Sequence, residues 1–86
     1  METTREWIIQ WFLANANADE KTLRESVEEN YFDKGLIDSF TFISLIADIE
    51  ETFSIEFDND QFIDRKFATV AGLTDIVDGL RQNHET

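Results

Sequence analysis

The chain has 86 residues, of which 42% are hydrophobic, and we expect one folded domain spanning residues 1–86 and no deep substrate cavity. Its formal net charge is −12, which makes nucleic acid and anionic membranes poor partners and a basic protein surface the natural complement. It contains no cysteine, so disulfides, zinc–thiolate sites and a cysteine nucleophile are excluded.

The spacing of apolar residues along the chain predicts an all-α fold. There is no proline, only three glycines are present, and apolar residues recur at intervals of three or four. The first helix is predicted from Thr3 to about Ala14, with Thr3 and Glu6 as a possible capping box. Its apolar residues are Trp7, Ile8, Trp11 and Phe12.

The segment from Asp19 to Asp38 has a weaker pattern. Three apolar residues recur at four-residue spacing, namely Leu23, Val27 and Tyr31. This spacing fits a short helix or an anchored loop, because a connection of this length without structure is unusual in a compact domain. We expect the segment to be pinned by Leu23, Tyr31 and Phe32, and Gly35 to turn the chain into the next helix.

The remaining elements are predicted over three ranges. A long helix spans about Ser39 to Phe53, a short piece spans Gln61 to Arg65, and a last helix runs from Thr69 to about Gln82. Asn83 to Thr86 then form a frayed tail. The apolar stripe of the last helix consists of Val70, Leu73, Ile76, Val77 and Leu80.

The helix over residues 39–53 carries two separate arcs of apolar residues. One arc is a core stripe that we expect to be buried, and it consists of Phe42, Leu45, Ile46, Ile49 and Phe53. The other begins at Ser39, ends in acids, and consists of Phe40, Ile43, Ala47, Glu50 and Glu51. Core packing does not require this second arc, so we interpret it as a surface for docking a basic partner. The alternative is that Phe40 and Ile43 pack under the long connection and the two glutamates serve solvation.

Ser39 is predicted at the start of this helix, next to Asp38. A helix N-terminus stabilises a negative group, so the position suits a hydroxyl that carries a phosphate. Hydrolysis by this serine is not expected, because a serine nucleophile needs a base within reach and the one histidine, His84, lies in the tail. An aspartate and a serine at a helix start also serve commonly as a simple cap.

Two stretches of the sequence resemble acyl carrier proteins. They are Tyr31 to Phe40, which contains the Asp38-Ser39 pair, and Leu45 to Phe57, which contains Glu50-Glu51 and the pattern Phe-x-Ile-x-Phe. A weaker similarity continues through Phe67 to Val70. The resemblance implies a small four-helix bundle with a long loop between the first and second helices. It further implies a non-catalytic carrier whose serine receives 4′-phosphopantetheine from a separate phosphopantetheinyl transferase.

The resemblance also implies roles for particular residues. Ser39 is the attachment point, and Asp38 helps the transferase hold its magnesium-bound coenzyme A substrate. The partner-recognition surface comprises Phe40, Ile43, Ala47, Glu50 and Glu51, and the partners are the transferase, an acyl- or aminoacyl-loading ligase and downstream synthase or transferase enzymes. Acyl or aminoacyl groups ride as thioesters on the arm, and a bound chain could be lined by Ile43, Phe57 and Ile76.

The spacing of the motif bears on the cargo. Leu36 and Ile37 separate Gly35 from the Asp-Ser pair, whereas many fatty-acid carriers have one residue there, and Phe40 stands where leucine or methionine is usual. Proline after Phe57 is also absent. The spacing is more similar to D-alanyl and other aminoacyl carriers, or to free-standing carriers of secondary-metabolite pathways.

The sequence argues against a calcium site and leaves one main alternative to the carrier. A calcium loop beginning at Asp58 fails, because Ile63 stands where glycine is needed and Thr69 where glutamate closes the loop, so no metal site is predicted. The main alternative is an unmodified acidic helical module, an inhibitor or nucleic-acid mimic, that binds a basic protein.

No apolar run reaches the roughly 20 residues of a membrane span, and no signal peptide is evident, so we expect a cytoplasmic protein. We also expect it to be a monomer.

Overall fold

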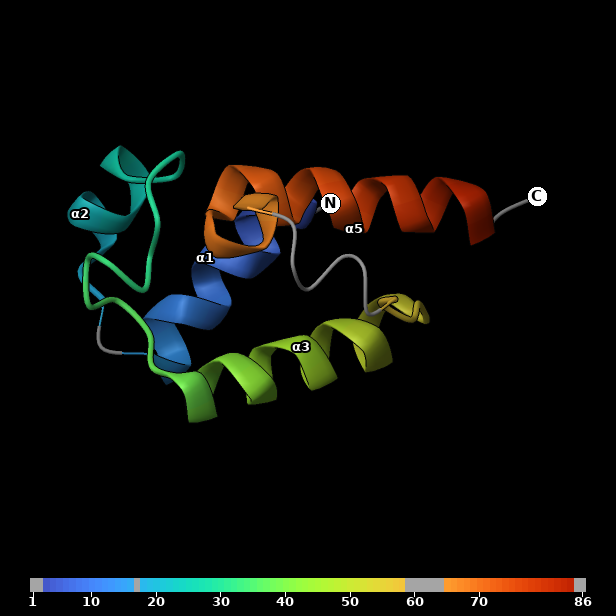
Figure 1. Ribbon diagram of the computed structural model, residues 1–86, viewed down its shortest axis with the longest axis horizontal. Helices are drawn as coiled ribbons and strands as arrows, with labels where there is room; N and C mark the ends of the chain where they lie inside the picture. Colours follow the sequence, from blue (N-terminus) through green and yellow to red (C-terminus); the bar gives the residue numbers. More distant parts are fainter. Residues whose placement is uncertain (1–2, 17, 59–64, 85–86) are drawn as a thin grey trace.

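The computed structural model describes residues 3–16, 18–58 and 65–84, and the regular elements in these parts of the chain are helices (Figure 1). The elements in chain order are α1 (Thr4–Asn15), α2 (Glu20–Glu25), α3 (Ser39–Phe53), the 3₁₀ helix η1 (Arg65–Ala68) and α5 (Val70–His84). The described residues contain no β-strand, which confirms the predicted all-α fold. Within the same residues, no helix has the length and apolar character needed to cross a membrane.

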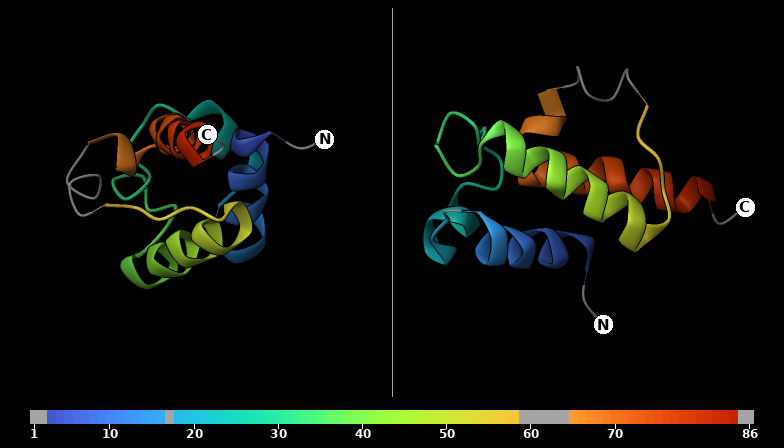
Figure 2. Two further views of the ribbon diagram at one scale, coloured as in Figure 1. Left: turned by 90° about the vertical axis from the view of Figure 1, so that its right-hand side faces the viewer. Right: turned by 90° about the horizontal axis from the view of Figure 1, so that it is seen from below.

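The helices form a bundle in which α1 links the other two long helices. It starts beside α5 and runs towards the start of α3, while α2 lies at one end of the molecule (Figures 1 and 2). At its beginning, the Thr4 hydroxyl donates to Asp78 Oδ1 at 2.5 Å and accepts from Arg81 Nη1 at 2.7 Å. Thr4 is 4% exposed, and these two bonds satisfy its buried hydroxyl where α1 packs against α5.

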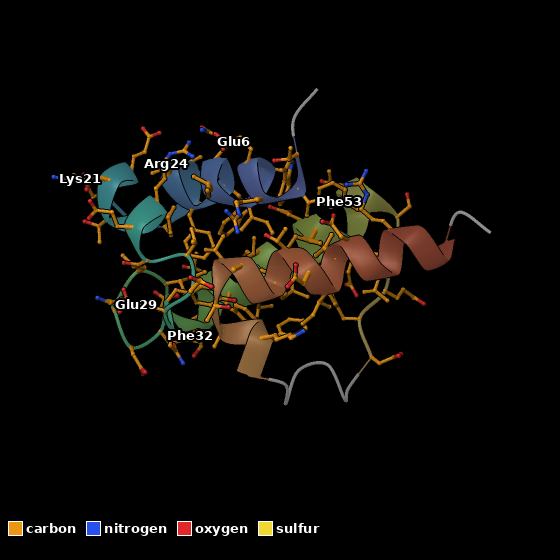
Figure 3. The ribbon with its side chains drawn as sticks, turned by 90° about the horizontal axis from the view of Figure 1, so that it is seen from above. Glu6, Lys21, Arg24, Glu29, Phe32 and Phe53 are labelled. Atoms are coloured by element: carbon orange, nitrogen blue, oxygen red, sulfur yellow. The ribbon has the colours of Figure 1, made fainter. Side chains whose placement is uncertain are left out.

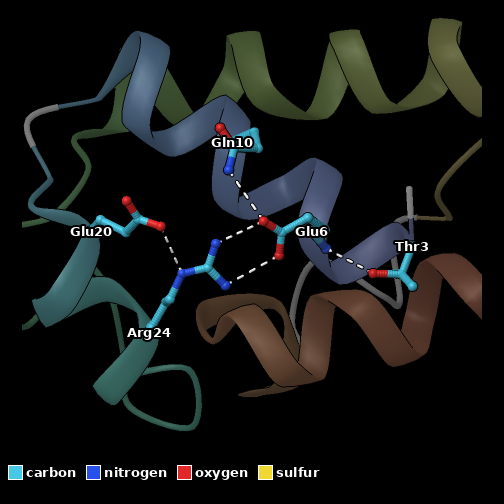
Figure 4. A network of polar contacts seen from close by, with 5 residues as sticks. All are labelled: Thr3, Glu6, Gln10, Glu20 and Arg24. Carbon is cyan, nitrogen blue, oxygen red and sulfur yellow. Dashed lines mark hydrogen bonds and ion pairs between the residues drawn. The ribbon is translucent and has the colours of Figure 1, made fainter. Parts of the chain in front are cut away.

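The start of α1 contains half of the predicted capping box. Thr3 Oγ1 accepts from the Glu6 backbone N–H at 3.1 Å, but the Glu6 carboxylate turns away and binds the Arg24 guanidinium at 2.7 Å. Glu6 also accepts from Gln10, and Arg24 also pairs with Glu20 at 3.0 Å, so the network ties α2 to α1 (Figures 3 and 4). Hydrogen bonding to Arg24 lowers the pKa of Glu6.

The connection between α1 and α3 contains the short helix α2, and a short helix was one of the two structures expected there. Most of the residues predicted to anchor the connection do so. Leu23 and Tyr31 are buried, and Gly35 turns the chain with φ +71°. Phe32 is different, since 38% of it is exposed and its ring covers the Tyr31 and Phe42 rings at 5.2 and 5.1 Å from the outside. An aromatic residue at the edge of a core keeps one face in solvent even when the other is packed.

Two of the five predicted core residues of α3 lie at the edges of the core. Leu45, Ile46 and Ile49 are buried as expected, but Phe42 and Phe53 are only half-buried. Phe53 packs edge-on against Trp7 at 5.3 Å, and the Arg81 guanidinium lies 4.7 Å from the centre of its ring. The prediction that both rings are buried was wrong. Phe42 and Phe53 are the first and last residues of the core stripe of α3, and they lie at its edges.

Helix α5 extends to His84, so two residues assigned to the frayed tail are helical. Val70, Leu73 and Val77 are buried, whereas Ile76 and Leu80 are half-buried. The start of α5 packs closely on η1, since a Cβ atom added at Gly72 would lie 2.4 Å from the Lys66 carbonyl oxygen. The short piece predicted over residues 61–65 falls mostly outside the described residues, and η1 begins at Arg65.

Candidate functional site

Ser39 is the first residue of α3, and its side chain is exposed, as the sequence predicted for the start of this helix. Asp38 is the N-cap, with extended backbone angles of φ −106° and ψ 176°. Its Oδ1 accepts from the Thr41 backbone N–H at 2.8 Å, and its carbonyl accepts the first helical bond from Phe42 at 2.9 Å. The hydrogen bond from the Thr41 N–H lowers the pKa of Asp38, so the cap is ionised at neutral pH.

The two residues before the cap explain why Ser39 is held at the surface. Leu36 and Ile37 are 6% and 7% exposed, and the Leu36 N–H donates to the Tyr31 carbonyl at 2.9 Å. Their side chains anchor the chain in the core immediately before Asp38. The positive φ of Gly35 lets the backbone enter this anchor, because glycine adopts that region without strain.

The arrangement suits a phosphodiester on the Ser39 oxygen. Ser39 is exposed and can be reached by a partner enzyme, and the first N–H groups of a 15-residue helix and its dipole favour a negative group there. Asp38 already satisfies one of these N–H groups. A flexible arm can leave this position without displacing any buried side chain.

The outer arc of α3 forms an exposed surface, which we call the docking face and define as Phe40, Ile43, Ala47 and Glu51. Phe40 is 85% exposed and Ile43 is 65% exposed, and Ala47 and Glu51 are exposed as well. The alternative in which Phe40 and Ile43 pack under the long connection is therefore wrong. Two large apolar side chains are therefore exposed on one turn of this small acidic protein.

Glu50 was predicted with the docking face but has a contact of its own. It is half-buried, and its Oε2 accepts from the Phe57 backbone N–H at 3.1 Å. The helix ends at Ser54 in the left-handed region with φ 56°, and Glu50 holds the chain that follows. One of its carboxylate oxygens therefore serves the fold, a role that sequence spacing did not indicate.

The three residues suggested as lining for a bound chain are not all in the core. Ile43 lies on the outer surface, whereas Phe57 and Ile76 are half-buried and pack against the core cluster. The Phe57 ring packs edge-on against Phe67, with ring centres 5.0 Å apart. The exposure of Ile43 follows from its place on the outer arc of α3.

Two open hollows flank the start of α3, and sequence reasoning did not find them. One, of about 210 Å³, is lined by Trp11, Asn15, Phe40, Thr41 and Ser44. The other, of about 450 Å³, is lined by Asn15, Ala16, Gly35, Leu36, Ile37, Asp38 and Thr41. The end of α1 meets the start of α3 here (Figure 1), and segments so distant in sequence carry no local signal of their contact.

A hydrogen bond between α1 and α3 fixes one wall of the smaller hollow. The Trp11 indole N–H donates to Asp48 Oδ2 at 2.6 Å, although the residues are 37 positions apart. Trp11 is 7% exposed, so its N–H needs such a partner.

Among the described residues there is no group of three or more side chains that could hold a metal ion. Asn59 and Asp60 of the calcium loop considered above lie outside those residues.

Comparison with protein families gives one match, to the model described as the phosphopantetheine attachment site, over residues 6–77. Comparisons with curated proteins and with solved structures give no significant match. The matched family carries covalently attached 4′-phosphopantetheine, and its domains are generally non-catalytic partners of transferases and biosynthetic enzymes. The helical bundle agrees with the acyl carrier type. The match covers most of the chain, and the protein therefore belongs to the phosphopantetheine-binding family of acyl carrier proteins.

Proposed function

We propose that Ser39 carries the 4′-phosphopantetheine arm and that the protein delivers acyl or aminoacyl groups, held as thioesters on that arm, to enzymes of a biosynthetic pathway. The observation that carries the proposal is the exposed Ser39 side chain at the first residue of α3. It lies inside the range matched by the family, and the buried Leu36-Ile37 pair fixes the chain just before it.

The loading step is a transfer to oxygen catalysed by the separate transferase. The Ser39 oxygen attacks the phosphorus of coenzyme A that bears the pantetheine, the pyrophosphate bond breaks, and adenosine 3′,5′-bisphosphate leaves. The hydroxyl proton passes to a base of the transferase. Asp38 directly precedes Ser39 in the chain, and its carboxylate, ionised at neutral pH, can help hold the magnesium ion of that substrate.

The docking face supplies recognition of the partner enzymes. Phe40, Ile43 and Ala47 offer an apolar centre, and Glu51 offers a charge that selects a basic partner surface. Glu50 contributes less than predicted, because one of its oxygens is bound to the Phe57 N–H. The transferase, a loading ligase and the downstream synthase or transferase enzymes all approach the same face in turn.

The cargo we favour is set by the spacing before the Asp-Ser pair. Leu36 and Ile37 both enter the core, so the two-residue spacer is part of the structure that presents Ser39. This spacer resembles that of aminoacyl carriers of the D-alanyl type and of free-standing carriers in secondary-metabolite pathways. We therefore place aminoacyl groups ahead of fatty acyl chains.

Intact-protein mass spectrometry tests the attachment point directly. Incubation with coenzyme A, magnesium and a promiscuous phosphopantetheinyl transferase should add one prosthetic group to the wild-type chain and none to the Ser39→Ala variant. Thr52→Ala removes an exposed hydroxyl from the far end of the same helix and should be loaded normally. A known carrier treated in parallel shows that the transferase is active.

The same experiment separates the carrier from an unmodified acidic module that binds a basic partner. Such a module does not need the Ser39 hydroxyl. An unchanged wild-type mass with several active transferases, or full loading of Ser39→Ala, would contradict the proposed attachment.

A further inference from the structure

Two hollows lie beside the start of α3, and the residues before and after the proposed attachment residue line them. Asp38 lines the larger hollow, Phe40 lines the smaller one, and Thr41 lines both. Ser39 itself lines neither hollow, but it stands between Asp38 and Phe40 in the chain, so a flexible arm attached to its oxygen starts one residue from the lining of each. A tethered group reaches such a neighbouring site at high effective concentration, which allows weak contacts to hold it.

The walls of the hollows match the chemistry of a pantetheine arm, which has two amides, a hydroxyl and a dimethyl group. Asn15 lines both hollows, and its Nδ2 donates to the Trp11 carbonyl at 3.1 Å. That bond uses one N–H group, and the amide oxygen and second N–H remain capable of pairing with an amide of the arm. Thr41 and Ser44 add hydroxyl groups, while the Trp11 and Phe40 rings offer apolar surface.

The shape of this place is fixed before any arm arrives. Asp48 binds the Trp11 indole N–H at 2.6 Å and holds the ring, and the buried Leu36 and Ile37 form a wall of the larger hollow. The larger hollow has a volume of about 450 Å³ and is open to solvent. Preformed walls reduce the ordering cost of binding.

We infer that the 4′-phosphopantetheine arm rests along the end of α1, in the two hollows, with Asn15 as its main polar contact and Trp11 and Phe40 against its dimethyl group. This inference rests on the proposed attachment to Ser39. It places the resting arm between α1 and α3 and away from the half-buried Ile76 of α5. The arm then lies against the carrier between deliveries, and the docking of a partner on Phe40 can release it.

The test compares the unloaded and loaded protein by NMR, after mass spectrometry has shown that one group was added. The chain has two tryptophans, which give two indole N–H signals. We expect the Trp11 signal to shift on loading and the Trp7 signal to stay, because Trp7 packs against Phe53 at the other end of α3. Nuclear Overhauser contacts should join the dimethyl protons of the arm to the Trp11 and Phe40 rings.

Asn15→Ala is the decisive variant, and Gln10→Ala is its matched control. Gln10 is an exposed amide on the same helix whose side chain donates to Glu6 (Figure 4). Both variants should be loaded fully, but Asn15→Ala should lose most of the Trp11 shift and the arm contacts, while Gln10→Ala keeps them.

The outcomes distinguish this inference from the function on which it rests. If the arm of the loaded protein contacts Ile76, or if its NMR signals are as narrow as those of free coenzyme A, the inferred resting site is wrong. The attachment to Ser39 still stands in either case. A chain that active transferases cannot load overturns both. Retained arm contacts in Asn15→Ala overturn the role of that residue.

Discussion

Tyr31 attaches the long connection to the rest of the bundle through three of its groups. Its backbone N–H donates to the Ala68 carbonyl at 2.9 Å, and its buried hydroxyl donates to the Phe67 carbonyl. Its ring packs between Phe12 at 5.2 Å and Phe42 at 6.1 Å. Burial raises the pKa of the Tyr31 hydroxyl, because the charged phenolate loses its hydration in the core.

Replacing Tyr31 with Phe should lower the free energy of unfolding at pH 7 by about 1–2 kcal/mol, since the buried Phe67 carbonyl loses its donor. The difference from wild type should shrink above pH about 10. There the unfolded chain releases the phenol proton while the folded chain keeps it, so wild-type stability falls by up to about 1.4 kcal/mol per pH unit. Lysine titration is common to both proteins and cancels in the comparison.

Urea unfolding of both proteins between pH 7 and pH 11 measures this difference. Tyr31 is the only tyrosine, so no other phenol contributes. A constant difference across the range would contradict the buried, neutral hydroxyl.

At the scale of single residues, the sequence predicted which side chains are important. It predicted the contacts of those side chains less well. Its apolar periodicity identified Leu45, Ile46 and Ile49 as core, because a 3.6-residue repeat decides which side of a helix faces inwards. It could not show that Phe42 and Phe53 lie at the edges of that core. Whether a ring at the margin of a stripe is covered depends on the neighbouring element.

Among the elements, α3 combines three tasks on separate sides. Its inner side supplies core residues, its outer side is the docking face, and its first turn presents Ser39. The Asp38 cap connects these tasks, because it fixes where the helix begins and thus that Ser39 is its first residue. The Asp38 carboxylate can both cap the helix and assist the transferase during loading. Two substitutions of Asp38 separate these roles.

Asp38→Ala should lower the melting temperature by a few degrees, whereas Asp38→Asn should leave it nearly unchanged, since asparagine caps helices about as well as aspartate. Asp38→Asn should nevertheless slow loading by the transferase, because it removes the charge next to the magnesium-bound substrate. Thermal unfolding and mass-spectrometric time courses measure the two effects. Loading of Asp38→Asn at the wild-type rate would show that Asp38 acts only as a cap.

The cap also makes α3 sensitive to acid. Because hydrogen bonding to the Thr41 N–H lowers the folded pKa of Asp38, its contribution is present above its ordinary pKa near 4 and is lost as the pH falls through the folded value. The Asp38→Asn variant lacks this dependence, so its stability should decline less than that of wild type in acid.

For the whole molecule, charge is the dominant property. Nineteen acidic residues face seven basic ones on a body with a radius of gyration of 12.1 Å. Basic side chains of the described residues are engaged with acids or with the core edge, since Arg24 binds Glu6, Lys34 binds Glu29 at 3.2 Å, and Arg81 covers Phe53. The excess negative charge repels itself in the folded state and attracts basic partners.

Sodium chloride should therefore stabilise the fold. The screening length falls from about 30 Å at 0.01 M to about 8 Å at 0.15 M, that is, from longer than the molecule's radius to shorter. We expect the melting temperature to rise by several degrees over this range, measured by circular dichroism at pH 7. Uncharged sucrose at the same osmolarity is the control, and a melting temperature that falls with salt would contradict net self-repulsion.

The sequence by itself determined the helical class, the place of Ser39 at a helix start and the apolar outer arc of α3, because these depend on local spacing, capping and composition. It left open whether Phe40 and Ile43 are covered, and the tertiary structure decided that both are exposed. Only the fold could bring Trp11 to Asp48 and place Asn15 and Thr41 around the same hollow, since both depend on how α1 crosses α3. Packing between elements distant along the chain has no periodic signal, so the hollows beside Ser39 became visible only in the assembled bundle.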